Sequence, residues 1–373
     1  MNIGITCYPT YGGSGTIATE LGRNLARRGH KVHFITTALP YRLSEFVENI
    51  YFHEVQVFNY PLFDYVPYSL SLASKMAQIA LLEDLDLLHV HYAVPHATSA
   101  YLARKIVEHK KTLPVITTLH GTDITLVGID PSYFDITRFS IEESDAVTAV
   151  SRYLKNQTLY RFAIKKNIEV IPNFVDPDRF KPDTSLSRSC FTQPDEKILM
   201  HISNFRPVKR IQDIIEVFDG VSQQIKAQLI LIGSGPEKEN AHALIEQKGL
   251  TDRVHFLGRQ DDVSQILPLA DIYLLLSEHE SFGLTALEAM SCEVPVIGTS
   301  GSGMEGYLGD GTAGLLFPVG DVSAMVDGCM RILKNPGLAH NMGKQGRKRA
   351  IEDYHVNEIV DQYEMLYQKV LRE

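Results

Sequence analysis

The sequence predicts an α/β protein that contains two doubly wound parallel-sheet domains. Short apolar runs alternate with longer amphipathic segments along the whole chain, and glycine-containing turns join several of them. Runs that are apolar almost throughout are typical of parallel strands with helices on both faces of the sheet. The length of 373 residues exceeds one ordinary core and fits two domains of roughly 150 residues each. These observations favour two consecutive series of strand–helix–strand units.

Eleven apolar runs are predicted strands. Six lie in the first part of the chain, at residues 3–7, 32–36, 87–92, 115–119, 146–151 and 168–171. Five lie in the second part, at residues 198–203, 228–233, 254–257, 272–277 and 294–299. The first strand leads through a glycine turn into a helix predicted over residues 16–28, which Gly29 ends.

A linker is predicted where periodicity is lost, at the proline-flanked residues 172–177 and the polar stretch 181–195. We therefore expect a first domain over residues 1–177 and a second over 178–353. Residues 354–373 have the spacing of one amphipathic helix, which we expect to return to the first domain. Two such domains suggest a cleft at the carboxyl edges of their strands.

The composition of the chain argues against several classes of protein. The formal charge of −9 argues against a nucleic-acid binder, which needs a cationic surface. No run is long enough for a membrane span, and the first residues lack the features of a signal peptide. The four cysteines, Cys7, Cys190, Cys292 and Cys329, are far apart and are interpreted as reduced thiols. We expect a cytoplasmic protein without stable membrane insertion; a homo-oligomer is left open.

The glycine loop at residues 11–15 follows the first strand and opens the first helix. Glycines such as Gly13 let a backbone approach a ligand closely, and the amides of a helix start favour an anion. A plain connecting turn is the alternative. The second strand ends at residues 34–37 without the acidic residue that would bind a ribose, so an NAD-dependent oxidoreductase is disfavoured.

The most informative segment is residues 280–288, between a predicted strand and a predicted helix. A helix that begins near Gly283 places Glu288 roughly 7 Å along its axis, with Glu280 before the helix. Free amides of Phe282, Gly283 and Leu284 would lie between the two carboxylates. Such a site can hold a nucleotide sugar, with diphosphate on the amides and hydroxyls on the acids. A surface loop with ordinary acids is the alternative.

Two glutamates with seven residues between them, after a strand, resemble the signature of the retaining GT-B glycosyltransferases of family 4. Further similar segments are residues 170–173, 203–209, 233–237 and 256–259. The resemblance covers essentially the whole chain. It implies two Rossmann-like domains that face a central cleft, an acceptor domain followed by a nucleotide-sugar domain, and no cofactor or metal.

A narrower similarity involves residues 3–9, 119–124 and 201–206. These segments resemble a branch of the family that starts bacillithiol biosynthesis. That resemblance implies UDP-N-acetylglucosamine as the donor, L-malate as the acceptor, and a product that keeps the α configuration.

The resemblance also implies roles for residues at strand ends. Arg206 and Lys209 would neutralise the diphosphate, for which both side chains are suited. Asn204 would join the donor site, and Arg259 would border the uracil. His120 would lie beside the transferred sugar and, with Glu280, act in catalysis.

A binding site for malate needs at least one cationic side chain and several hydrogen-bond donors. Arg138, which we expect at the start of a helical segment, is the candidate cation; an ordinary helix pair with Glu142 is the alternative. Ser14, Tyr92 and Thr118 are the accompanying candidates.

Other features are discounted. His89, His91 and His96 lack a carboxylate that would complete a metal site, and the Asp-x-Asp pairs at 84–86 and 176–178 fit turns. The sequence departs from the family at Glu293, where a glycine usually caps the helix, and in the loop 300–306, which we expect not to affect the Glu280 and Glu288 pair.

Three alternatives remain open. A related transferase could use a sugar phosphate or a lipid-linked sugar as acceptor. An epimerase would convert UDP-N-acetylglucosamine without any acceptor. A non-catalytic sensor would bind the donor only.

Overall fold

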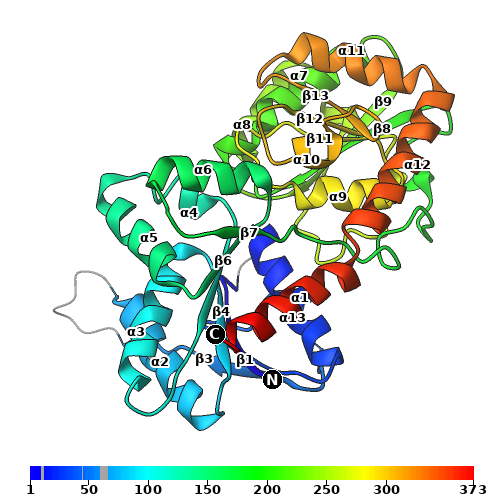
Figure 1. Ribbon diagram of the computed structural model, residues 1–373. Coiled ribbons are helices and arrows are strands. Elements are labelled where there is room, and N and C mark those ends of the chain that lie inside the picture. The colour runs from blue at the N-terminus through cyan, green and yellow to red at the C-terminus, as the bar shows by residue number, and fades with distance from the viewer. Residues whose placement is uncertain (10–11, 44, 59–65) are drawn as a thin grey trace. The chain divides into compact units, whose positions relative to one another are not determined.

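The computed structural model describes residues 1–9, 12–43, 45–58 and 66–373 (Figure 1). The chain divides into two compact units, and each is an α/β unit with one parallel sheet. The first unit contains Met1–Asn173 together with Asn357–Glu373, and the second contains Phe174–Val356. Tyr11 of the predicted glycine loop lies outside the described residues.

The first unit has a seven-stranded sheet in the order β3-β2-β1-β4-β5-β6-β7, with every neighbouring pair parallel. Its strands are β1 Asn2–Thr6, β2 Lys31–Thr36, β3 Ile50–Glu54, β4 Leu87–His91, β5 Val115–Leu119, β6 Ala146–Ala149 and β7 Ile168–Val170. Its helices are α1 Gly13–Arg27, α2 Tyr68–Leu82, α3 Thr98–Val107, α4 Thr122–Thr125, α5 Pro131–Glu143, α6 Arg152–Phe162 and most of α13 Val356–Val370.

The second unit has a six-stranded sheet in the order β10-β9-β8-β11-β12-β13, again parallel throughout. Its strands are β8 Lys197–Ser203, β9 Ala227–Gly233, β10 Val254–Gly258, β11 Ile272–Leu275, β12 Val296–Thr299 and β13 Gly314–Phe317. Its helices are α7 Ile211–Ser222, α8 Lys238–Gln247, α9 Leu284–Ser291, α10 Glu305–Leu308, α11 Val322–Leu333 and α12 Pro336–Asp353.

All eleven predicted strands are present, each within two residues of its predicted ends. The two strands that the sequence analysis missed, β3 and β13, are edge strands. An edge strand has a neighbouring strand on only one side, and most side chains of β3 and β13 are only partly buried, so neither has the continuous apolar run of a central strand. In β3 no residue is fully buried, which removes the signal used for the other strands.

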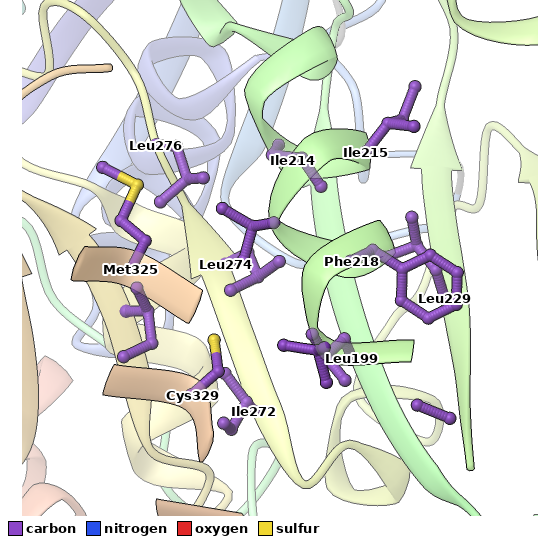
Figure 2. Close-up of a cluster of buried hydrophobic side chains, with 14 of the residues drawn as sticks. Leu199, Ile214, Ile215, Phe218, Leu229, Ile272, Leu274, Leu276, Met325 and Cys329 are labelled. Atoms are coloured by element: carbon purple, nitrogen blue, oxygen red, sulfur yellow. The ribbon is translucent and has the colours of Figure 1, made fainter. Parts of the chain in front are cut away.

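The core of the second unit lies between its sheet and the helices α7 and α11. Figure 2 shows Leu199 of β8, Leu274 of β11, Phe218 of α7 and Cys329 of α11 in one cluster of buried side chains. All four side chains are completely buried. Because the central strands are fixed in this way, the loops at their carboxyl ends have a rigid base.

Helix α13 packs on the first unit through both apolar and polar contacts. Tyr363 and Tyr367 are buried, and the Tyr367 hydroxyl lies 2.7 Å from His89 Nδ1. On its outer side, Arg28 pairs with Asp361 and Glu364. None of the described helices is both long and apolar enough to cross a membrane.

The end of α9 carries backbone strain where the sequence departs from the family pattern. Glu293 has φ 63°, in the left-handed region that favours glycine. Its carboxylate lies 3.1 Å from Lys344 Nζ, a contact with a half-exposed lysine that stabilises little. The helix therefore ends with the geometry of a glycine cap but without the glycine.

Replacement of Glu293 by glycine is expected to stabilise the protein by about 0.5–1 kcal/mol, because the left-handed conformation then costs less. Glu293→Ala keeps the strain, loses the Lys344 contact and should not stabilise. Thermal midpoints of the two variants and the parent measure the effect. Equal midpoints for the glycine and alanine variants would show that the backbone at residue 293 is not strained.

Candidate active site

A carboxylate–ammonium pair stands at the carboxyl edge of the second sheet. Glu280 follows β11, and Lys209 ends the short turn that follows β8, the strand paired with β11. Lys209 Nζ lies 2.7 Å from Glu280 Oε2, and the hydroxyl of Ser277 donates to the same oxygen at 3.2 Å. The side chains of Lys209 and Glu280 are 21% and 14% exposed. The pair is therefore partly withdrawn from water but still open to a ligand.

The pKa of Glu280 is lowered. Burial alone would raise it, but the charge of Lys209 and hydrogen bonds from Lys209, Ser277 and the Phe282 N–H outweigh the effect of burial. Glu280 is therefore an anion at neutral pH. Its acceptor capacity suits the hydroxyl groups of a sugar, and the neighbouring ammonium suits a phosphate.

The turn between Glu280 and α9 depends on Gly283. This residue caps α9 with φ 89°, and a Cβ there would lie 2.6 Å from the Tyr307 hydroxyl. The Tyr307 hydroxyl bonds the carbonyl groups of Phe282 and Gly283 at 2.7 and 3.0 Å. Tyr307 thus holds the carbonyl groups of the turn inward, and the start of α9 is fixed in place.

The predicted set of three free amides is reduced to two. The N–H of Phe282 donates to Glu280, and the Phe282 ring is buried against Tyr307. The backbone N–H groups of Gly283 and Leu284 donate to no described residue. These two amides can bind an anion.

Glu288 lies in the second turn of α9, and the residue is only 4% exposed. Its negative charge contributes to the raised pKa of Tyr273, after the larger effect of burial. The two acids of the signature thus have different surroundings, with the ammonium of Lys209 bonded to Glu280.

The remaining donor-site candidates present unused groups. Arg206 and Arg259 are exposed, and neither guanidinium group makes a hydrogen bond or ion pair with any of the described residues. The Asn204 side-chain oxygen is buried without a partner in the described chain. A Cβ at Gly235 would lie 1.9 Å from the Asn204 carbonyl oxygen, so only glycine allows the two loops to meet here.

The loop at residues 300–306, whose altered sequence is expected to leave the Glu280 and Glu288 pair unaffected, contacts the backbone of Glu280. The Gly303 N–H donates to the Glu280 carbonyl oxygen at 2.7 Å, and a Cβ on Gly303 would lie 1.9 Å from the Ser281 oxygen. The Gly301 N–H donates to the Glu305 carboxylate at 2.7 Å. The loop therefore supports the backbone of Glu280 without the Pro-Glu of the family pattern.

In the first unit, His120 and Tyr92 lie at the carboxyl edge of the sheet. Their ring centroids are 5.4 Å apart, and His120 Nε2 lies 2.8 Å from His91 Nδ1. The Tyr92 hydroxyl donates to Ser14 Oγ at 2.9 Å. Tyr92 has φ 91°, a conformation that costs energy for a non-glycine residue. The structure thus brings Ser14, Tyr92 and His120 together, and Gly13 is exposed beside Ser14 at the start of α1.

Thr118 and Arg138 have different surroundings. Thr118 is completely buried, and its hydroxyl bonds His89 Nε2 and Thr148 Oγ1, both at 2.7 Å. Its hydroxyl therefore supports the strand and does not face solvent. Arg138 lies in the second half of α5, where a start had been expected, and it is exposed. It has no partner among the described residues; Glu142 instead accepts from the Lys165 N–H.

Asp123 was missed as a candidate. Its carboxylate accepts from the Ala93 N–H at 2.8 Å and the Gly121 N–H at 3.2 Å, and it is 2% exposed. Burial raises its pKa to about 6 against these hydrogen bonds. Asp123 ties together the two loops that carry Tyr92 and His120. The only sequence feature that could have indicated this role is the presence of an acid in the segment 119–124. A contact between two loops produces no periodic pattern in the sequence.

One group of side chains among the described residues lies close enough to share a metal ion: His33, His53 and Glu83. The two imidazoles are already hydrogen-bonded at 2.9 Å. Burial lowers the pKa of both, and the positive charges of Lys31 and Lys75 contribute to the shift. The Glu83 carboxylate opposes this shift more strongly than either lysine adds to it, and the group is a hydrogen-bonded histidine pair beside an acid.

The fold and the residues at the two sheet edges fit a sugar transferase, and the comparisons with known proteins establish that class. Two family models match the chain: "Glycosyltransferase Family 4" at residues 11–179 and "Glycosyl transferases group 1" at residues 185–349. The chain belongs to glycosyltransferase family 4.

Full-length relatives agree with this assignment. The N-acetyl-alpha-D-glucosaminyl L-malate synthase of Bacillus anthracis is 48% identical over 100% of this chain and 98% of its own length. An uncharacterised glycosyltransferase, MJ1607, of Methanocaldococcus jannaschii is 26% identical over 92% of this chain and 90% of its own.

Solved structures establish the GT-B fold. Sucrose-phosphate synthase from Thermosynechococcus elongatus matches with a TM-score of 0.84 and 22% identity, over 100% of this chain and 99% of that one. Anabaena HepE, solved with UDP and glucose, matches with a TM-score of 0.84 and 18% identity over 99% of each chain. The prediction of two Rossmann-like domains with the GT-B fold is confirmed.

Replacement of Lys209 by methionine is expected to destabilise the protein at pH 8 by about 1–3 kcal/mol, because it leaves the Glu280 carboxylate without its ammonium partner. In the parent, the pKa of Glu280 lies below its ordinary value of 4.5, so this contribution is present above that pH and is lost only in acid. In the variant, burial raises the pKa, so the deficit should shrink as pH falls from 8 to 5. Thermal midpoints across this range measure the difference.

The matched control is Lys209→Met combined with Glu280→Gln. It removes the titrating group, so its deficit relative to the parent should not change between pH 8 and pH 5. A deficit of Lys209→Met that is equally large at both pH values would contradict the role assigned to the pair.

Proposed function

We propose that the enzyme transfers N-acetylglucosamine from UDP-N-acetylglucosamine to the hydroxyl of L-malate, with retention of the α configuration, as the first step of bacillithiol biosynthesis. The observation that carries the proposal is the 48% identity, over the whole chain, with the L-malate synthase of Bacillus anthracis. Exposed arginines support it, because both substrates are anions: Arg206 and Arg259 follow strands of the second sheet, and Arg138 lies in α5 of the first unit.

In this proposal the second unit, predicted at residues 178–353, holds the donor. Arg206, Lys209 and the amides of Gly283 and Leu284 receive the diphosphate, and Arg259 and Asn204 border the nucleoside. Glu288 binds ribose hydroxyls and Glu280 binds those of the transferred sugar. The Lys209–Glu280 pair supports this arrangement, because an ammonium and a carboxylate 2.7 Å apart suit the phosphate and sugar ends of one ligand.

The first unit, predicted at residues 1–177 with residues 354–373 added to it, receives malate. Arg138 pairs with a malate carboxylate, and Ser14 and Tyr92 supply hydroxyl groups. The complete burial of Thr118 supports a structural role for that residue instead of contact with the acceptor.

The proposed chemical step takes place on one face of the sugar. The bond between the anomeric carbon and the β-phosphate oxygen breaks, the malate hydroxyl oxygen bonds the same carbon, and the hydroxyl proton moves to the departing phosphate. Stabilisation of the charge that develops on the diphosphate is then the largest contribution to catalysis. Lys209 and Arg206 supply it with no metal ion. His120 contacts the sugar as it reacts.

The proposal also places the reaction in the cytoplasm. The four cysteines are free in the structure, and Cys7, Cys292 and Cys329 are buried, which suits a reducing compartment. The oligomeric state is left open.

The direct test is incubation of the purified enzyme with UDP-N-acetylglucosamine, L-malate and excess EDTA. We expect UDP release and a product with the mass of N-acetylglucosaminyl malate and an α-anomeric proton signal. Succinate, which lacks the hydroxyl, serves as the matched acceptor control and should give no product. Donor conversion with malate omitted would indicate an epimerase, and turnover only with a sugar phosphate or lipid-linked sugar would indicate another acceptor.

Arg138→Ala is expected to raise KM for malate roughly 10- to 100-fold, the effect of one lost charge-assisted hydrogen bond. KM for the donor should change less than about 2-fold. The arginine is exposed and has no partner among the described residues, so folding should be unaffected. Steady-state kinetics with each substrate varied in turn gives both values.

Glu288→Ala is the reciprocal control for Arg138→Ala, because it should raise KM for the donor and leave KM for malate nearly unchanged. An unaltered malate KM in the Arg138 variant would remove that residue from the acceptor site.

A further inference from the structure

The inference concerns the proton between His91 and His120. His91 Nδ1 and His120 Nε2 are 2.8 Å apart, and the two rings are stacked with centroids 5.1 Å apart. A neutral imidazole carries one proton, on either nitrogen. One ring must therefore donate and the other accept, and the choice determines which atom His120 offers to a ligand.

His96 shows how this buried cluster distributes its protons. His96 Nδ1 lies 2.5 Å from the carbonyl oxygen of His91, and a carbonyl oxygen can only accept. The His96 proton is therefore on Nδ1, which leaves a lone pair on Nε2. That atom is buried and has no partner among the described residues. In His96, therefore, the N–H has an acceptor, and the nitrogen without a partner is the one that carries the lone pair.

His91 has the same constraint. Its Nε2 is also buried without a partner in the described part of the chain. If His120 donated to His91 Nδ1, the only proton of His91 would lie on that isolated Nε2, and a buried N–H would lack an acceptor. Such orphaned donors are rare in folded proteins and cost free energy. If His91 donates from Nδ1, every imidazole proton of His91 and His96 has an acceptor.

This proton count holds only if the imidazoles of His91 and His120 are neutral, and burial keeps both of them neutral. Burial lowers the pKa of His120 to about 3, and burial lowers that of His91 well below its ordinary value. His91 is also held from its other side, since it stacks on His89 with centroids 4.5 Å apart. His89 in turn bonds Tyr367 of α13 at 2.7 Å.

We propose that His91 is a positioning residue: its Nδ1–H donates to His120 Nε2 and fixes His120 as the tautomer that carries its proton on Nδ1. His120 Nδ1 has no partner among the described residues and is not one of the buried unpaired atoms. It therefore presents an accessible N–H to a ligand oxygen. The identity of that oxygen, a hydroxyl or carbonyl of the transferred sugar, rests on the proposed function; the tautomer does not.

The tautomer assigns a chemical role to His120. A neutral ring whose only lone pair accepts from His91 has no free base on the ligand side. His120 therefore acts as a hydrogen-bond donor and does not remove the proton of the acceptor hydroxyl. The proton transfer to the departing phosphate described above needs no contribution from this ring.

The first test is long-range ¹H–¹⁵N NMR of the ligand-free protein labelled with ¹⁵N-histidine at pH 7. Spectra of His120→Asn and His91→Asn assign the two rings by loss of signal. We expect both rings to be protonated on Nδ1 and unprotonated on Nε2. A proton on His120 Nε2 would overturn the proposal. The experiment uses no substrate, so its result is independent of whether malate is the acceptor.

The second test compares His91→Asn with His91→Leu. The asparagine amide N–H can take the place of Nδ1–H, whereas leucine fills the space without a donor. We expect His91→Asn to keep kcat within about 3-fold of the parent and His91→Leu to lower it roughly 10- to 100-fold, with KM values little changed. Equal kcat values for the two variants would contradict a donor role.

A double-variant cycle separates positioning from general damage to the fold. If His91 acts through His120, His91→Leu should lower kcat much less in a His120→Ala background than in the parent. An equal fold-loss in both backgrounds would show that His91 does not act through His120. Should His91→Leu fail to fold, the NMR result on the parent protein still decides the tautomer.

Discussion

The donor side depends on the contact between Lys209 and Glu280. Each residue follows a central strand of the second sheet, β8 or β11, and these strands are neighbours because a crossover brings distant segments together. Ser277, the Phe282 N–H and the Gly303 N–H then act on the same turn, by way of the Glu280 carboxylate or its carbonyl group. Without the ammonium, a poorly hydrated carboxylate would repel a diphosphate at the start of α9. With it, two neighbouring turns present a cation, an anion and two free amides, which in the proposed function bind different parts of the donor.

The two sheet edges differ in how they keep ligand-facing groups in place. In the second unit, glycines permit backbones to touch, as Gly303 does beside Ser281 and Gly235 beside Asn204. In the first unit, a side chain holds the loops in place: the Asp123 carboxylate accepts hydrogen bonds from N–H groups of two loops. Charges are therefore balanced locally in the second unit, whereas neutral hydrogen-bonded rings dominate beside His120.

Much of the fold could be predicted because its signals are local. Central parallel strands are apolar throughout. At Glu293, where the family has glycine, the sequence indicated a different helix end or some strain, and the φ of 63° shows a left-handed, strained end. The edge strand β3 was not predicted, because its side chains are half-buried or exposed and give no apolar run. Within the site, Lys209 and Glu280 were expected after two strands, and the structure has them there, after the neighbouring strands β8 and β11; their roles stay a prediction. The sequence could not show that the Thr118 hydroxyl is hydrogen-bonded to buried side chains. Its partners lie in β4 and β6, which are distant from Thr118 in sequence.

Net charge is a poor guide to the ligands of this chain. The total is −9, yet the proposed function requires two anionic substrates. Many basic side chains are neutralised by nearby acids, as Arg349 is by Asp310 and Lys248 by Asp219. Arg138, Arg206 and Arg259 differ, since they are exposed and have no acid partner among the described residues. A guanidinium without a partner keeps its full capacity for a carboxylate or phosphate, so what identifies these positions is the absence of pairing, which the composition of the chain cannot reveal.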